Sequence, residues 1–334
     1  MKKNIPVFVT HYGCPNQCVF CNQKKISGYS RQMDFSECEQ LLEAAASKGY
    51  APNDTEVAFF GGSFTGIPRA EQKRYLEIAQ QYRSSFGGIR LSTRPDYISH
   101  SQLAFLKEYG VTTIELGVQS MVDQVLIANK RGMTAEDTKN AVSLIRQYDF
   151  SLGLQMMTGM YQSSLEDDWK TAEEIIRLRP DFVRIYPTVV LEDTELYELY
   201  KAGEYTFRSL NETVSHVAEI AEKFLQNKIP VIRIGLMASE EISPDKVIGA
   251  YHEAFGEMVQ GEIYFKRIVF SLKDKETKDK ILTIHCPSRF VSWVVGHNKR
   301  NINRLTKLYS LKKIKVIGNF MDNSDPFFFQ VELQ

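Results

Sequence analysis

The chain of 334 residues has no long apolar run, no excess of either charge and no set of paired cysteines. No stretch approaches the ~18 apolar residues of a membrane-spanning helix, and the apolar run near the N-terminus is too short for a signal peptide. Lysine plus arginine equal aspartate plus glutamate at 41 each, so the whole-chain charge predicts no partner. Five cysteines without a disulfide pattern favour a reducing, cytoplasmic location.

Three of the cysteines, Cys14, Cys18 and Cys21, stand in the run HYGCPNQCVFCNQ. Their C-x3-C-x2-C spacing, with Phe20 just before the last thiol, can hold three irons of a [4Fe-4S] cluster and leave the fourth iron open. An open metal position is typical of a reactive site, because structural sites complete their coordination. The alternative is a zinc knuckle, which needs a fourth ligand nearby, and only His11 is close.

This cysteine motif resembles that of the radical SAM superfamily. The resemblance implies S-adenosylmethionine as a second cofactor, with its amino and carboxylate groups on the open iron. It also implies reductive cleavage of that cofactor to a 5′-deoxyadenosyl radical. No second cysteine triad occurs in the sequence, so we expect no auxiliary cluster.

Short apolar runs alternate with amphipathic stretches along most of the chain. The expected strands are residues 7–10, 57–60, 89–92, 113–117, 152–156, 182–186 and 231–236. The expected helices between them are residues 35–47, 69–84, 102–109, 135–148, 165–177 and 212–226. This alternation is typical of βαβ units around a parallel sheet. We therefore predict an α/β fold, an open (β/α)6 partial TIM barrel of the radical SAM type, with its site at the C-terminal ends of the strands.

Glycines and polar residues follow several expected strands. The candidates for cofactor contact are Phe20, Gly61, Gly62, Ser63, Gln119, Arg131 and Gln155. Glycines let the backbone approach a ligand closely, although a Gly-Gly-Ser sequence is often only a turn. A buried polar side chain without a partner would cost a few kcal/mol, so these side chains need either a cofactor or one another. For Glu115 the two interpretations stay open.

The segments STRPDYI, IELGVQSM, KRG, IYPTVVLEDTELYELYKAGEY and VIRIGL are similar to the radical SAM core of the Elongator catalytic subunit and its bacterial relatives. The resemblance covers residues 1–240. It implies that Arg131 binds the methionyl carboxylate, that Gln155 binds the ribose hydroxyls and that Gln119 lines the same pocket. It also implies that the Gly-Gly-Ser backbone meets the amino group of S-adenosylmethionine.

Two features depart from the Elongator subunit. The first two cysteines are closer together here, at the general superfamily spacing. Too few residues follow Ile234 to hold the acetyltransferase domain of Elongator, so we expect no acetyl-CoA-dependent carboxymethylation.

Residues 285–320 contain eight basic residues and neither aspartate nor glutamate, within a chain whose net charge is zero. The basic residues are Arg289, Lys299, Arg300, Arg304, Lys307, Lys312, Lys313 and Lys315. Such asymmetry points to a polyanionic partner.

The expected elements of this region are a strand, two helices around the sequence Gly296-His297-Asn298-Lys299, and two further strands. The pattern resembles a KH-type RNA-binding module, in which a GxxG loop clamps single-stranded RNA. Lys299 replaces the second glycine and supplies a phosphate partner. The resemblance implies RNA contacts at Gly296, His297, Asn298, Lys299, Arg300 and Arg304. The alternative is a small α/β cap with a solvated basic face.

We predict three segments: a radical SAM core (1–240), a connecting segment packed on that core (241–269) and a basic KH-like module (270–334). The predicted function is reductive cleavage of S-adenosylmethionine to modify tRNA or rRNA, with flavodoxin or ferredoxin as electron donor. The alternative is action on a small molecule or peptide, with the basic module as a partner surface. We expect neither a membrane nor DNA as partner.

The remaining candidates have mainly structural interpretations. Cys38 and Cys286 are expected to be packed thiols, with a reactive thiol as the alternative for Cys286. Residues 327–329, three phenylalanines, are expected in a buried strand, with a base-stacking platform as the alternative. Tyr97, Tyr186 and Tyr264 are candidates for the mouth of the barrel.

Overall fold

The structure is a computed structural model, and it describes residues 3–9, 14, 18–22, 25–26, 32–51, 54–237, 242–320 and 327–334. The chain divides into two compact units. The first comprises Met1–Ser209 with Lys223–Tyr251, and the second comprises Leu210–Glu222 with His252–Gln334. Helix α9 (Leu210–Gln226) therefore contributes to both.

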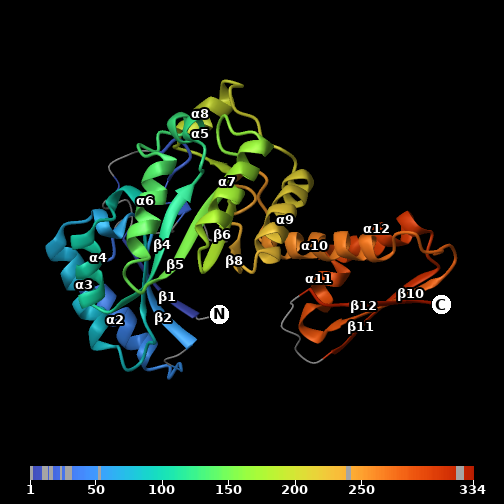
Figure 1. The fold of residues 1–334 in the computed structure, drawn as a ribbon, viewed down its shortest axis with the longest axis horizontal. Helices are drawn as coiled ribbons and strands as arrows, with labels where there is room; N and C mark the ends of the chain where they lie inside the picture. Colours follow the sequence, from blue (N-terminus) through green and yellow to red (C-terminus); the bar gives the residue numbers. More distant parts are fainter. Residues whose placement is uncertain are drawn as a thin grey trace. The chain divides into compact units, whose positions relative to one another are not determined.

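A parallel sheet forms the centre of the first unit (Figure 1). Within the described residues its seven strands are β1 (Lys3–Phe8), β2 (Thr55–Phe60), β3 (Ile89–Thr93), β4 (Val111–Gln119), β5 (Ser151–Thr158), β6 (Phe182–Pro187) and β8 (Val231–Ile234). They lie side by side in chain order, and every pair is parallel. This arrangement confirms the predicted α/β half-barrel, which brings the C-terminal ends of all strands to one edge.

Helices follow most of these strands. They are α2 (Phe35–Ala46), α3 (Arg69–Gln81), α4 (His100–Glu108), α5 (Asp123–Ala128), α6 (Ala135–Ile145), α7 (Leu165–Leu178) and α8 (Glu195–Lys201). Short 3-10 turns are η2 (Phe64–Gly66) and η3 (Pro95–Tyr97), and a small sheet joins β7 (Val189–Leu191) to β9 (Val247–Gly249). Thr134 and Ser164 form capping boxes with Asp137 and Asp167 at the starts of α6 and α7.

The two faces of the sheet differ in polarity. Helices α6 and α7 lie over β4 and β5 (Figure 1), and alternate strand residues such as Ile114, Leu116 and Leu154 are fully buried. Because successive side chains of a strand point to opposite sides, the residues between them share the other face. That face carries Glu115 and Gln155, which is unusual for a parallel sheet and marks it as the functional face.

The second unit contains a three-stranded sheet in the order β11 (Lys313–Phe320), β10 (Ile281–Pro287), β12 (Gln330–Leu333). Its helical elements are α10 (Phe255–Ser271), η4 (Ser288–Phe290), α11 (Val291–Val295), η5 (His297–Lys299) and α12 (Arg300–Tyr309). Strand β10 is parallel to β11 and antiparallel to β12. The expected strand–helix–helix–strand order is therefore present. The predicted connecting segment is divided between the units after Tyr251, and α10 belongs to the second.

Aromatic side chains pack inside the second unit. Phe327 is only 3% exposed, and its ring lies 5.2 Å from that of Tyr264 and 6.2 Å from that of Trp293. Phe327 is thus a packing residue. Tyr264 is fully buried in α10, so its prediction as a barrel-mouth residue was wrong.

The two isolated cysteines are fully buried. Burial raises the pKa of Cys38 to about 12 and that of Cys286 to about 11. Both therefore stay protonated at neutral pH, as expected of packed thiols. None of the described helices is both long and apolar enough to cross a membrane.

Candidate functional site

The cysteine loop follows β1 at the C-terminal edge of the sheet. Cys18 is buried, whereas Cys14 and Cys21 are partly exposed, and the Cys21 N–H donates to the Cys18 carbonyl at 3.0 Å. Residues 15–17 and His11 lie outside the described residues. In the described part of the chain, no three His, Cys, Asp or Glu side chains stand close enough to hold a metal ion.

An apolar cluster packs against the cysteine loop. Phe20 packs in it with Val125, Met160, Leu196 and Tyr205. The Leu196 N–H at the start of α8 donates to the Val19 carbonyl at 2.7 Å. The segment after β6 therefore supports the cysteine loop, and Phe20 lies in this support.

The Gly-Gly-Ser loop after β2 reaches the first cysteine. Gly61 has a φ of 104°, a conformation open to glycine, and Gly62 leads to the buried Ser63. The Ser63 backbone hydrogen-bonds the Cys14 thiol, and its hydroxyl lies 2.8 Å from that of Thr93 at the end of β3. Three successive strand ends are thereby joined.

Two arginines lie beside the cysteines. Arg131 donates from Nη1 to Cys18 Sγ at 3.2 Å and from Nη2 to the Gly117 carbonyl at 2.6 Å. Burial raises the pKa of Cys14, whereas the charges of Arg94 and Arg131 act in the opposite direction. The two arginine charges favour the thiolate, the form that binds metal, but burial outweighs them and keeps the pKa of Cys14 above its usual value.

The end of β4 contains a polar atom that the described protein does not satisfy. Gln119 has a φ of 68° at an irregularity of the strand, and its buried Oε1 has no hydrogen-bond partner among the described residues. A Cβ at Gly117 would lie 3.2 Å from Gln119 Nε2, so glycine keeps this space open. An unsatisfied acceptor close to Arg131, which itself donates to Cys18, fits a polar cofactor bound next to a metal cluster.

Glu115 lies at the centre of a buried network on the functional face. It is 0% exposed and accepts hydrogen bonds from Arg90 Nη1 at 2.6 Å and from Arg184 Nη2 at 2.9 Å. Gln155 Nε2 donates to Glu115 at 2.8 Å and to the Ser92 hydroxyl at 3.3 Å. Of the two interpretations of Glu115, the structure supports internal bonding, and it places Gln155 in the same network.

Sequence reasoning missed Arg94, Asp96 and Arg184. Arg94 directly follows β3 and pairs with Asp96 through two 2.9 Å hydrogen bonds. The sequence contained a signal for Arg94 and Asp96, because two opposite charges directly after a buried strand indicate a structural or functional role. Tyr97 follows this pair in η3, and the partly exposed Tyr186 hydrogen-bonds Arg184.

The loop of the second unit has an uncommon backbone. Gly296, Asn298 and Lys299 have φ values of 76°, 51° and 59°. A Cβ at Gly296 would lie 2.7 Å from Asn301 Cγ, so only glycine fits there. Asn298 and Lys299 are exposed, whereas His297 is partly covered and its ring lies 4.9 Å from that of His252.

Two of the basic residues predicted to bind RNA already have partners. Arg304 forms a fork with both oxygens of the buried Glu262 and stacks over Phe265, with its Cζ 3.5 Å from the ring centroid. Arg300 donates to the Asn211 side chain. By contrast, five of the eight are exposed lysines, namely Lys299, Lys307, Lys312, Lys313 and Lys315.

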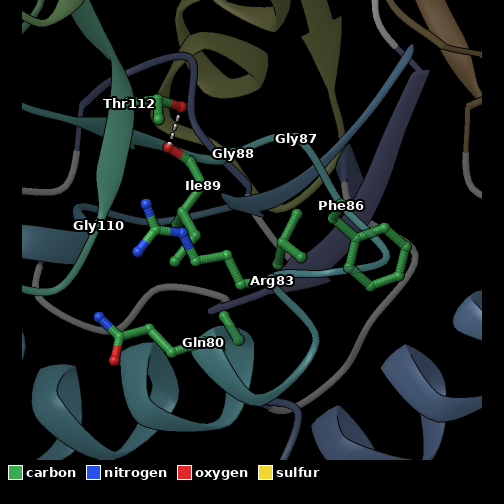
Figure 2. Close-up of a pocket in the computed structure, with 10 residues that line it drawn as sticks. Gln80, Arg83, Phe86, Gly87, Gly88, Ile89, Gly110 and Thr112 are labelled. Carbon is green, nitrogen blue, oxygen red and sulfur yellow. Dashed lines mark hydrogen bonds between the residues drawn. The ribbon is translucent and has the colours of Figure 1, made fainter. Parts of the chain in front are cut away.

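A separate pocket lies at the opposite end of the sheet (Figure 2). It is lined by the starts of β3 and β4, including Gly88 and Thr112, and by Gln80 and Arg83. Because the cysteine loop lies at the C-terminal ends of the strands, this pocket belongs to no part of the candidate site.

Comparison with known proteins matches the Radical SAM superfamily domain to residues 8–175, half of the chain, and the Radical_SAM C-terminal domain to residues 180–264. The tRNA uridine(34) acetyltransferase of Methanocaldococcus infernus is 38% identical over 210 residues, covering 55% of this chain and 39% of that protein. Elongator complex protein 3 of Homo sapiens is 25% identical over 263 residues, covering 65% of this chain and 48% of that protein. The chain thus spans less than half the length of either relative.

The solved structure of archaeal Methanocaldococcus infernus Elp3 with an N-terminal deletion has the same fold. Its TM-score is 0.60 at 24% identity, covering 79% of this chain and 67% of that one. The predicted resemblance to the Elongator core is therefore confirmed. The chain belongs to the radical SAM superfamily, whose enzymes use a [4Fe-4S] cluster and S-adenosylmethionine as cofactors.

Proposed function

We propose that this protein cleaves S-adenosylmethionine reductively to a 5′-deoxyadenosyl radical and uses the radical to modify RNA, with tRNA as the first candidate. One observation carries the proposal. Ser63, after β2, hydrogen-bonds Cys14, and Arg131, after α5, donates to Cys18, so residues far apart in the chain meet at the cysteine loop. The similarity to a tRNA uridine(34) acetyltransferase and the exposed lysines of the second unit support RNA as the substrate.

In this proposal Cys14, Cys18 and Cys21 hold the cluster. When bound and reduced, the cluster supplies the electron that cleaves the cofactor. The residues proposed to bind S-adenosylmethionine are Phe20, Gly61, Gly62, Ser63, Gln119, Arg131 and Gln155.

The proposed roles of Gln119, Arg131 and Phe20 have specific physical reasons. The unsatisfied oxygen of Gln119 needs a donor, and an amino group of the cofactor would supply one. The Arg131 guanidinium is the natural partner of a carboxylate. The apolar cluster around Phe20 excludes water from the back of the loop, and this protects a reactive radical. The electron would come from a small donor protein such as flavodoxin or ferredoxin.

RNA binding is assigned to the second unit. The Gly296–Lys299 loop presents the exposed side chains of Asn298 and Lys299 on a backbone held by the buried Asn301. Lysine side chains neutralise phosphates, so binding should weaken steeply as salt rises. His297 and Arg300 are proposed as further contacts at the edge of the loop. The fork between Arg304 and Glu262 holds α12 on α10, so Arg304 contributes to RNA binding by positioning that helix.

The first experiment tests cofactor chemistry. Protein reconstituted without oxygen should hold about four irons and release 5′-deoxyadenosine from S-adenosylmethionine when dithionite is added. The triple variant C14A/C18A/C21A should lose both properties, whereas the matched variant C38A should keep them. Cleavage by the triple variant, or stoichiometric zinc in wild-type protein, would contradict the proposal.

The second experiment identifies the substrate. Nucleosides from the tRNA and rRNA of a deletion strain and its parent should differ in one modified nucleoside by mass spectrometry. Neutralising Lys299 and Lys307 together should weaken RNA binding and reduce its salt dependence by about two charges, without changing cofactor cleavage. If every nucleoside is unchanged and no RNA binds at moderate salt, a small molecule or peptide is the substrate.

A further inference from the structure

Arg94 is a buried arginine that connects two loops of the candidate site. Its side chain is 5% exposed, and its Nε and Nη2 each donate to one carboxylate oxygen of Asp96 at 2.9 Å. Nη2 also donates to the backbone carbonyl of Arg131 at 2.6 Å. The guanidinium is thus fixed by a neighbour in its own turn and holds a residue 37 positions away.

The backbone that Arg94 holds carries the Arg131 side chain to the cysteine loop. Arg131 donates to Cys18 Sγ at 3.2 Å. Lys130, just before it, has a φ of 53°, a conformation that a non-glycine residue adopts only with support. The bond from Arg94 to the next carbonyl is such a support.

We propose that Arg94 is a positioning residue, which holds the Arg131 loop so that the Arg131 guanidinium reaches the sulfur of Cys18. This inference rests on the proposed function, in which that sulfur binds the cluster. Hydrogen bonds to sulfur and nearby charge set the potential of an iron–sulfur cluster. Donors and positive charge stabilise the reduced, more negative form. Loss of Arg94 would withdraw the donor and leave Asp96 uncompensated, so the reduction potential should fall.

The experiment compares R94Q and R94K with R83Q, an identical glutamine substitution at an exposed arginine of the remote pocket (Figure 2). Hydrogen exchange of residues 126–133 is measured in cluster-free protein. Redox titration by electron paramagnetic resonance is measured in reconstituted protein. The first readout needs no cluster, so it tests the positioning even if the proposed function fails.

In R94Q, exchange of residues 126–133 should rise about tenfold or more, because a charge-assisted bond is lost. At a fixed solution potential, the ratio of reduced to oxidised cluster should fall at least tenfold, which is 59 mV for one electron. R94K keeps the charge without the fork, so exchange should rise with a smaller fall in potential. R83Q should match the wild type in both. Exchange and potential in R94Q equal to those of R83Q would overturn the proposal. Wild-type protein without iron would instead overturn the proposed function.

Discussion

Replacing Glu115 by glutamine should destabilise the first unit more than any exposed carboxylate change. Glu115 is fully buried and accepts hydrogen bonds from Arg90 at 2.6 Å, Arg184 at 2.9 Å and Gln155 at 2.8 Å. Arg184 Nε also forms an ion pair with Glu115 at 2.6 Å. Arg90 would keep Glu56 at 2.8 Å, but Arg184, 12% exposed, would lose its carboxylate. Burial lowers the pKa of Arg184, yet Glu115 raises it above its usual value, so this arginine stays charged.

Breaking one side of a buried ion pair costs about 3–5 kcal/mol, because the remaining charge is uncompensated. That is a large share of the ~5–15 kcal/mol by which a typical domain is stable. Urea unfolding of cluster-free protein, with hydrogen exchange of β4 and β5 amides to locate the effect, measures the change. The control is E77Q, which breaks an exposed Lys73–Glu77 pair and should leave the free energy of unfolding almost unchanged.

A second variant separates charge from packing. Replacing Glu115 and Arg184 together by methionine should cost less than E115M alone, because no unpaired guanidinium remains from that pair. The reasoning would be refuted if E115Q lowered the free energy of unfolding by less than about 1 kcal/mol. It would also be refuted if the double variant were the less stable one.

Two further predictions concern local structure. G296A should lower the free energy of unfolding of the second unit by about 1–3 kcal/mol, because φ is 76° there and the added Cβ would clash with Asn301. The measurement is thermal unfolding of the full chain. The control is G203A, at an exposed glycine that also has positive φ but no atom near its Cβ, and G296A should cost more than this control. S164A should cost about 1 kcal/mol at neutral pH by removing the cap of α7. The Ser164 hydrogen bonds lower the pKa of Asp167 below 3.8, so their contribution is present above that pH and is lost as pH falls through the lower folded value. The gap in stability between wild type and S164A should therefore narrow in acid, and a gap that widens would contradict this account.

Features that depend on neighbouring residues could be predicted from the sequence. The cysteine spacing is a local property of one loop, and the caps at Thr134 and Ser164 involve residues three positions apart. The alternation of strands and helices follows from short apolar periods, and the half-barrel follows from that alternation. The Gly296 loop was also visible, because glycine stands where the backbone turns between two helices.

Side-chain partners depended on the tertiary structure. Glu115 bonds residues that are 25, 40 and 69 positions away, and Arg94 bonds a carbonyl 37 positions away. Strand register decides which of these side chains come into contact, since a slip of one residue moves every side chain of a strand to the other face of the sheet. The pairing of Arg304 with Glu262 also depended on tertiary structure. The charge of Arg304 was visible in the sequence, but Glu262 faces it only because α10 packs on α12. The sequence alone determined which chemical groups each strand end carries, and the packing of strands and helices decided which of those groups meet.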